Sequence, residues 1–86
     1  MHAMAAAPTV PLHPLTRYRQ RHNLSMNKLA ARANTTLATI SRIESGSRQP
    51  TVDMLFRLVE ATDREVSADE IIYFHMNRQG TANRGN

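Results

Sequence analysis

Short segments with helical spacing constrain the fold of this chain more than any other feature. Within each segment apolar residues return at intervals of three and four, and no stretch of useful length alternates with period two. Residues that cap helix N-termini (Ser25, Thr36 and Thr51) stand at the starts of segments. With 86 residues the chain has room for one small core. The sequence therefore predicts a single all-α domain without a sheet.

Five short helices with polar breaks between them are expected. Their spans are Pro14 to about His22, and then about 26–33, 36–45, 52–62 and 68–77. Pro14 suits the first turn of a helix because its missing N–H is not needed there. Ser67 and Glu70 have the spacing of a capping box, which marks the start of the last helix. The residues expected to end helices or form left-handed turns are Asn23, Asn34 and Gly46.

The core is expected to form from apolar residues on one side of each helix. These residues are Leu15, Tyr18, Leu29, Ala30, Ala33, Ile40, Ile43, Val52, Leu55, Leu58 and Val59. Residues 1–12, rich in Ala and Pro, are expected to be a flexible N-terminal arm. Residues 13–77 are expected to form the folded domain and residues 78–86 a disordered tail.

The positive charge is confined to one half of the chain. Residues 1–48 hold seven Lys and Arg against one Glu, a net of +6. Residues 49–86 hold four Arg against six acidic residues, a net of −2. Such an asymmetry is typical of a face that meets a polyanion, although charge alone does not distinguish nucleic acid from an anionic membrane or an acidic protein.

Several classes of function are disfavoured. The chain has no Cys, and its four His residues show no i+3 or i+4 pairing, so we expect no disulfide, metal or other cofactor. Ser41 and His22 lack an orienting acid and an oxyanion pocket, so we expect no enzyme. No apolar run reaches the ~18–20 residues of a membrane span, and the uncharged opening residues lead us to expect no export signal. A cytoplasmic protein without a small-molecule ligand is expected.

Residues 24–50 carry the functional signal. Two short helices joined by a turn of about three residues have the plan of a helix-turn-helix, whose second helix enters the major groove of DNA. Ile40 and Ile43 are expected to face the core, so the exposed side of that helix should carry Leu37, Ala38, Ser41 and Arg42. The N-terminus of the preceding helix, at Ser25, offers backbone N–H groups to a phosphate.

The residues of this segment resemble the Cro and phage-repressor type of helix-turn-helix, also called the xenobiotic-response-element family. The resemblance is carried by Leu24-Ser25, Leu29-Ala30, the run Thr39-Ile40-Ser41-Arg42-Ile43-Glu44-Ser45-Gly46, and Pro50-Thr51. It extends from about Leu15 to Ile72 and implies a compact five-helix, lambda-repressor-like domain. The order and spacing of several elements agree at once, which makes the resemblance specific.

The sequence departs from the family pattern at four places. Met26 stands where a Gln usually touches phosphate, so a contact there is left to backbone N–H groups or to Asn27. Asn34 replaces the usual turn Gly, a mild change because Asn accepts the same backbone conformation. Ser45 replaces the usual Asn before Gly46. The link over residues 61–66 is about two residues longer than typical, which leaves the angle of the fifth helix open.

The resemblance implies roles for particular residues. Those at base-contacting positions are Leu37, Ala38, Ser41 and Arg42, and those expected to meet phosphates are Ser25, Met26, Asn27, Thr36, Thr39, Ser45, Arg48 and Gln49. Arg42 is the strongest candidate, since a guanidinium can bond guanine O6 and N7 together. Leu37 and Ala38 would contact thymine methyl groups. Arg19 and Glu44 match the internal ion pair of the family.

The fifth helix is expected to present more apolar surface than a small core needs. Ile72, Tyr73 and Met76 would remain exposed in a monomer, and exposed apolar patches commonly mark an interface. Related small regulators bind paired half-sites as two-fold dimers, so we expect a homodimer.

Two functions remain open from the sequence. The first is a dimeric transcriptional repressor or autoregulator bound to a double-stranded DNA operator, similar in size to phage Cro-like proteins, restriction-modification controller proteins and antitoxins. The second is a protein-interaction module, antitoxin-like or anti-activator, that uses the fold to bind a protein partner. Strong salt dependence of DNA binding favours the first.

Overall fold

The computed structural model describes the backbone of residues 12–84 and the side chains of residues 12–77. Within this part of the chain all regular structure is helical: α1 (Pro14–His22), α2 (Met26–Arg32), α3 (Leu37–Ser45), α4 (Val52–Ala61) and α5 (Ala68–Arg84). The prediction of an all-α fold with five helices is confirmed. Of the predicted N-terminal arm, residues 1–11 lie outside the described residues.

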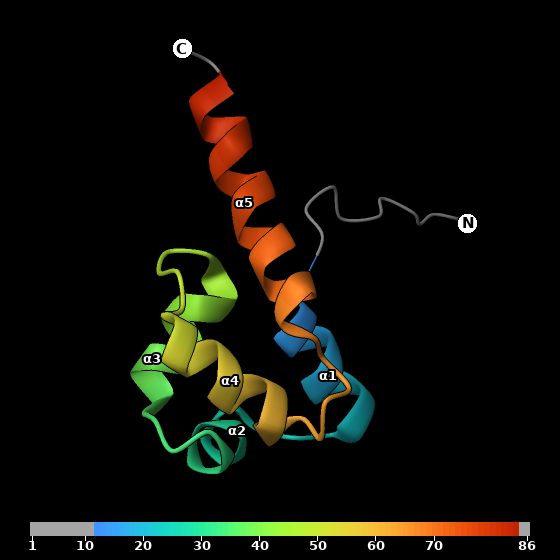
Figure 1. Cartoon of the computed structure of the whole chain (residues 1–86). Coiled ribbons are helices and arrows are strands. Elements are labelled where there is room, and N and C mark those ends of the chain that lie inside the picture. The colour runs from blue at the N-terminus through green and yellow to red at the C-terminus, as the bar shows by residue number, and fades with distance from the viewer. Residues whose placement is uncertain (1–11, 85–86) are drawn as a thin grey trace, which may run out of the picture.

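The first four helices gather around one end of the long α5, whose C-terminal part projects beyond them (Figure 1). α5 is 17 residues long and runs from Ala68 to Arg84, so the prediction that it ends near Asn77 and is followed by a disordered tail is wrong for residues 78–84. The physical reason is that Gly80 is the one strong helix-disfavouring residue in this stretch, and a Gly costs only about 1 kcal/mol relative to Ala.

Side-chain caps begin the helices where the sequence indicates. The side chains of Ser25, Thr36 and Thr51 each accept a hydrogen bond from the backbone N–H three residues further on. Ser67 and Glu70 form the predicted capping box: the N–H of Ser67 donates to Oε1 of Glu70 at 3.0 Å, and the N–H of Glu70 donates to Oγ of Ser67 at 3.1 Å. These interactions satisfy N–H groups that have no partner within the helix.

Left-handed residues end α1 and α3 and form the turn after α2. Asn23, Asn34 and Gly46 have φ values of 53°, 57° and 84°. The first two are asparagines, which adopt this conformation more readily than other residues with a Cβ atom. The expectation that Asn34 can replace a turn glycine is thus confirmed.

The core forms where the five helices meet. Its fully buried members at zero exposure are Leu15, Leu29, Ile40, Ile43, Leu58 and Ile71. Tyr18, Ala30 and Ala33 are also buried as predicted. Val52 is not part of the core, because it stands in the first turn of α4 and is 69% exposed.

Two histidines that are far apart in the sequence meet inside the molecule. His13 and His75 are both buried, and their Nε2 atoms lie 3.0 Å apart. The Nδ1 atom of His13 also accepts a hydrogen bond from the backbone N–H of Leu15, so His13 caps α1. The pair joins the start of α1 to α5. Among residues 12–77, no group of three or more potential ligands could hold a metal ion.

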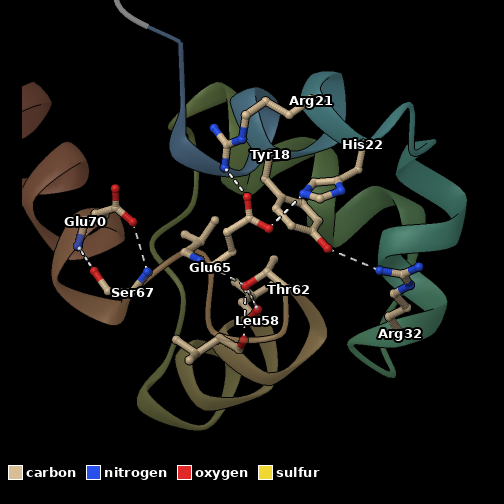
Figure 2. A network of polar contacts seen from close by, with 11 residues as sticks. Tyr18, Arg21, His22, Arg32, Leu58, Thr62, Glu65, Ser67 and Glu70 are labelled. Atoms are coloured by element: carbon tan, nitrogen blue, oxygen red, sulfur yellow. Dashed lines mark hydrogen bonds and ion pairs between the residues drawn. The ribbon is translucent and has the colours of Figure 1, made fainter.

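The long link between α4 and α5 has a defined conformation. Asp63 and Arg64 are both left-handed, with φ values of 53° and 63°. The buried hydroxyl of Thr62 donates to the main-chain oxygen of Leu58 and accepts from the N–H of Val66, at 3.1 and 3.3 Å (Figure 2). These contacts set the direction in which α5 leaves α4, the question that the unusual length of the link had left open.

Glu65 fastens this link to the end of α1. Its carboxylate contacts the Nε2 atom of His22 at 2.7 Å and the Nη2 atom of Arg21 at 3.2 Å (Figure 2). The hydrogen bond with His22, followed by that with Arg21, lowers the pKa of Glu65 from its ordinary value of 4.5. The folded state therefore favours the ionised form of the Glu65 carboxyl more than the unfolded state does.

We expect acid to destabilise the domain through Glu65. A carboxyl whose pKa is lower in the folded state stabilises it above the unfolded pKa of about 4.5, and this contribution is lost as the pH falls through the folded value. Thermal unfolding of wild type and Glu65→Gln, followed by circular dichroism from pH 7 to about pH 3, tests this. The wild type should lose more melting temperature than the variant below about pH 5. Parallel pH profiles for the two proteins would contradict the assignment.

Candidate nucleic-acid interface

α2 and α3 form two short helices of seven and nine residues, joined by a tight turn. The inner sides of the two helices pack through Leu29 and Ala30 of α2 and Ile40 and Ile43 of α3, all at most 3% exposed. The small Ala30 side chain is compatible with a close approach of the two helices. This is the arrangement of a helix-turn-helix, in which the second helix is held firmly by the first.

The outer side of α3 is open to solvent. Leu37, Ala38, Ser41 and Arg42, the four predicted base-contacting residues, are all exposed. They lie on one side of the helix, because positions i, i+1, i+4 and i+5 share a face, and this face is opposite to Ile40 and Ile43. Leu37 is 45% exposed although it is a large apolar residue. The structure thus brings these four side chains together on one accessible surface.

Most of the residues predicted to meet phosphates are also exposed. The exposed ones are Ser25, Asn27, Thr36, Ser45, Arg48 and Gln49, whereas Met26 and Thr39 are partly buried. Met26 packs against the core, which agrees with its apolar side chain and leaves its backbone N–H as the group that could face a phosphate. The Oγ1 atom of Thr39 accepts a hydrogen bond from Oγ1 of Thr36 at 3.0 Å, which leaves the hydroxyl proton of Thr39 able to donate.

The loop after α3 is organised by one main-chain oxygen. The carbonyl of Arg42 accepts from the N–H groups of Ser47 and Arg48 at 3.0 and 3.2 Å. The hydroxyls of Ser45 and Ser47 donate to the same oxygen at 3.0 and 3.2 Å. Ser45 therefore contributes its hydroxyl to the helix end in addition to the phosphate contact predicted for it. These contacts tie Ser47 and Arg48 to the end of α3, and Arg48 and the following Gln49 are exposed.

Glu44, at the end of α3, is bound from α1. Arg19 donates from Nε to Oε2 at 2.7 Å and from Nη2 to Oε1 at 2.8 Å, which makes a two-pronged pair. The side chains of Arg19 and Glu44 are 17% and 5% exposed. The hydrogen bonds to Glu44 raise the pKa of Arg19, against the opposing effect of burial. The two residues expected to pair are thus in direct contact.

Sequence reasoning missed one member of this cluster. The hydroxyl of Thr16 donates to Oε1 of Glu44 at 2.8 Å, and Arg19 also donates to the main-chain oxygen of Leu24 at 3.3 Å. Thr16 lies three residues before Arg19, hence on the same side of α1, and this spacing is the signal that could have identified it. The Thr16, Arg19 and Glu44 side chains together fix α3 to α1.

A second contact ties α2 to α1. The guanidinium of Arg32 donates to the phenol oxygen of Tyr18 at 3.3 Å, and the Tyr18 ring lies 4.4 Å from the ring of His22 (Figure 2). The ring of Tyr18 is buried in the core, and a buried tyrosine hydroxyl usually needs a hydrogen-bond partner, which Arg32 supplies here. Both helices of the helix-turn-helix are therefore anchored on α1.

The apolar residues predicted to form a dimer interface are exposed on α5. Ile72, Tyr73 and Met76 are 41%, 67% and 62% exposed. Their spacing puts them on one face of the helix, away from the buried Ile71 and His75. Among the described residues, no helix combines the length and apolar character needed to cross a membrane.

Comparison with known proteins identifies a family. The sequence model of a family described as helix-turn-helix matches residues 15–70, more than half of the chain. The matched range contains all of α1 but its first residue, α2 to α4 and the start of α5, and it includes every residue of the exposed α3 face. No curated protein and no solved structure matches the chain significantly.

Proposed function

The chain belongs to the Cro/C1-type helix-turn-helix family of DNA-binding regulators, and on this premise we propose that it is a sequence-specific, dimeric repressor or autoregulator. In this proposal α3 enters the major groove of an operator and contacts base edges. The observation that carries the proposal is the exposed α3 face of Leu37, Ala38, Ser41 and Arg42, on a helix that the Arg19 and Glu44 pair joins to α1. Because α3 is already folded, its exposed side chains can contact bases without a further loss of backbone conformational entropy.

Each of these residues suits a particular contact. The guanidinium of Arg42 can donate to O6 and N7 of one guanine, the commonest specific contact in the major groove. Leu37 and Ala38 present methyl groups, which favour contact with thymine C5-methyl groups. Ser41 can donate to or accept from a base edge of either kind. The combination would select a short sequence with a guanine beside at least one thymine.

Phosphate contacts would set the position of the helix without selecting sequence. Arg48 and Gln49 lie in the loop beyond α3, and Asn27 is exposed in the first turn of α2. The hydroxyls of Ser25, Thr36 and Ser45 already accept or donate within the protein. A phosphate oxygen only accepts hydrogen bonds, so the contact needs the hydroxyl proton. The hydroxyls of Ser25 and Thr39 accept within the protein and keep their protons for a phosphate, whereas Thr36 and Ser45 would have to turn their protons away from internal acceptors. The main-chain N–H of Met26 completes this proposed set.

The decisive experiment is binding to the DNA immediately upstream of the protein's own gene. Purified protein is titrated at two salt concentrations, with unrelated DNA of equal length as competitor. We expect specific protection of two half-sites about one helical turn apart and a steep fall of affinity with salt, because phosphate contacts release counterions. Weak binding that is insensitive to sequence would instead indicate the alternative, a module that binds a protein partner.

Dimerisation through α5 is the second part of the proposal. Ile72, Tyr73 and Met76 form an exposed apolar face on a helix that projects from the domain (Figure 1). A second copy related by a two-fold axis could bury this face against its own equivalent. Two recognition helices would then be available for two half-sites.

A charge placed on this face is expected to separate the dimer. Tyr73→Glu should weaken self-association by about tenfold or more, since central aromatic residues dominate most interfaces. Sedimentation velocity over a concentration series measures it. Phe56→Glu is the matched control, because Phe56 is 65% exposed on α4 and should leave association unchanged. A wild-type protein that is monomeric at concentrations saturating the operator would contradict the proposed interface.

A further inference from the structure

An arginine of α4 reaches the turn between α2 and α3. The Nη1 atom of Arg57 donates to the main-chain oxygen of Asn34 at 3.0 Å. Its Nη2 atom pairs with Oδ2 of Asp53, one helical turn earlier in α4, at 2.9 Å. The carboxylate meets one edge of the planar guanidinium while another of its N–H groups meets the turn. Arg57 therefore joins α4 to a turn that lies 23 residues away in the sequence.

The turn itself is attached to α2 through its N–H groups. Asn34 and Thr35 donate from their backbone nitrogens to main-chain oxygens of α2, at 3.1 and 2.9 Å. The oxygen of Asn34 instead accepts from Arg57. Asn34 adopts the left-handed conformation, with φ of 57°. One side of the turn is thus fixed by α2 and the other by α4.

This place in the chain controls where the recognition helix begins. Thr36, which caps α3, comes two residues after Asn34, and Leu37 is the first residue of α3. A small rotation about the Asn34 backbone would move this end of α3. Arg19 and Glu44 hold the opposite end of the same helix. The two contacts therefore act on the two ends of α3.

We propose that Arg57 is a positioning residue for DNA recognition, which holds the start of α3 in the orientation needed for base contacts. The proposal rests on the proposed DNA-binding function. Arg57 acts through the main-chain oxygen of Asn34. Its side chain is 41% exposed, and ion pairs with that exposure contribute little to folding. The consequence of losing it should therefore appear in sequence discrimination more than in stability.

A direct phosphate contact by Arg57 would have a different signature. Loss of a phosphate contact weakens binding to all sequences alike and reduces the salt slope by about 1. Loss of a positioning contact lowers affinity for the operator, leaves affinity for unrelated DNA unchanged and keeps the salt slope of unrelated DNA. The two roles can be separated with one set of titrations.

The test compares Arg57→Ala with two matched variants. Arg64→Ala removes an equal charge and likewise breaks an exposed ion pair, because Arg64 pairs with Glu60. That pair does not involve the turn between α2 and α3. Asp53→Ala removes the carboxylate partner of Arg57 but leaves the arginine able to reach Asn34. We expect Arg57→Ala to lose about five- to tenfold in operator affinity, the scale of one lost charge-assisted hydrogen bond. Arg64→Ala and Asp53→Ala should stay within about twofold, since exposed pairs are weak.

Hydrogen exchange of the turn amides gives a readout that needs no DNA. The N–H groups of Asn34 and Thr35 should exchange at least about threefold faster in Arg57→Ala than in Arg64→Ala, because local opening of the turn becomes easier. Unchanged exchange, or an equal loss of affinity for operator and unrelated DNA, overturns the positioning role. If the wild type shows no preference for the operator, the proposed function is overturned instead. The exchange rates of the Asn34 and Thr35 amides then decide whether Arg57 holds the turn.

Discussion

Replacing Arg42 by alanine is expected to reduce operator affinity by about 5- to 150-fold, the equivalent of about 1–3 kcal/mol for one bidentate contact to guanine. The affinity for unrelated DNA should fall much less. The specificity ratio would therefore decline nearly as far as the operator affinity itself. Competition titrations with operator and unrelated DNA at constant salt measure both quantities.

The fold gives this experiment a clear interpretation. The groups that organise the end of α3 bind the main-chain oxygen of Arg42, which alanine retains. Alanine is also the best helix former, so α3 should keep its structure. Arg64→Ala removes the same charge from the exposed link after α4 and serves as the control. If both variants lose affinity equally, Arg42 contributes only charge.

A base analogue can identify the partner of Arg42. Replacing one operator guanine by 7-deazaguanine removes the N7 acceptor and should weaken wild-type binding. At the guanine that Arg42 contacts, the same replacement should have little further effect on Arg42→Ala, because the interaction is already lost. Such non-additivity is the signature of a direct contact. Additive losses at every guanine of the operator would place the side chain of Arg42 elsewhere.

Glu44→Ala is expected to cause the largest loss of stability, about 3–5 kcal/mol. The substitution removes the carboxylate that accepts from Arg19 and Thr16, and it leaves a guanidinium that is 17% exposed without its counter-ion. For a domain of this size about 1 kcal/mol corresponds to roughly 4–8 °C, so the melting temperature should fall by more than about 12 °C. Thermal unfolding followed by circular dichroism measures it.

Glu60 provides the matched control for this prediction. Its carboxylate pairs with Arg64, but it is 65% exposed, and exposed pairs are worth about 0–1 kcal/mol. Glu60→Ala should therefore unfold close to the wild-type temperature. A double-mutant cycle of Arg19→Ala and Glu44→Ala then isolates their coupling. Equal melting temperatures for Glu44→Ala and Glu60→Ala would disprove the structural importance of the buried pair.

The two predictions are linked through α3. Glu44 lies two residues after Arg42 on the same helix, yet Glu44 faces α1 and Arg42 faces solvent. A variant of Glu44 should lose operator affinity partly because less protein is folded. Measuring binding well below the melting temperature of the variant separates this effect from a displaced helix.

Local sequence determined the starts and turns of the helices. Ser25, Thr36 and Thr51 cap the helices that follow them, because a short polar side chain can reach an N–H three residues away without help from the rest of the fold. Asn34 and Gly46 are left-handed for an equally local reason. The period of apolar residues placed Ile40 and Ile43 inward, and it therefore predicted which side of α3 is exposed.

The end of α5 was harder to predict from the sequence. Helix ends without a strong stop depend on small differences in propensity, and a single Gly80 did not end this one. Val52 was predicted to lie in the core but is exposed, for a related reason. Helical spacing alone does not show which residue of the first turn packs against a neighbouring helix. Both errors concern positions where local preferences are weak.

Only the tertiary structure decided the contacts between distant residues. His13 meets His75 and Arg57 reaches Asn34, and neither contact has a local spacing that announces it. The physical reason is that such contacts depend on the packing angles of whole helices, which result from the summed fit of the core. The sequence by itself determined which helices form and which face of α3 is open. The packing of α1 and α4 against the helix-turn-helix decided how that face is held.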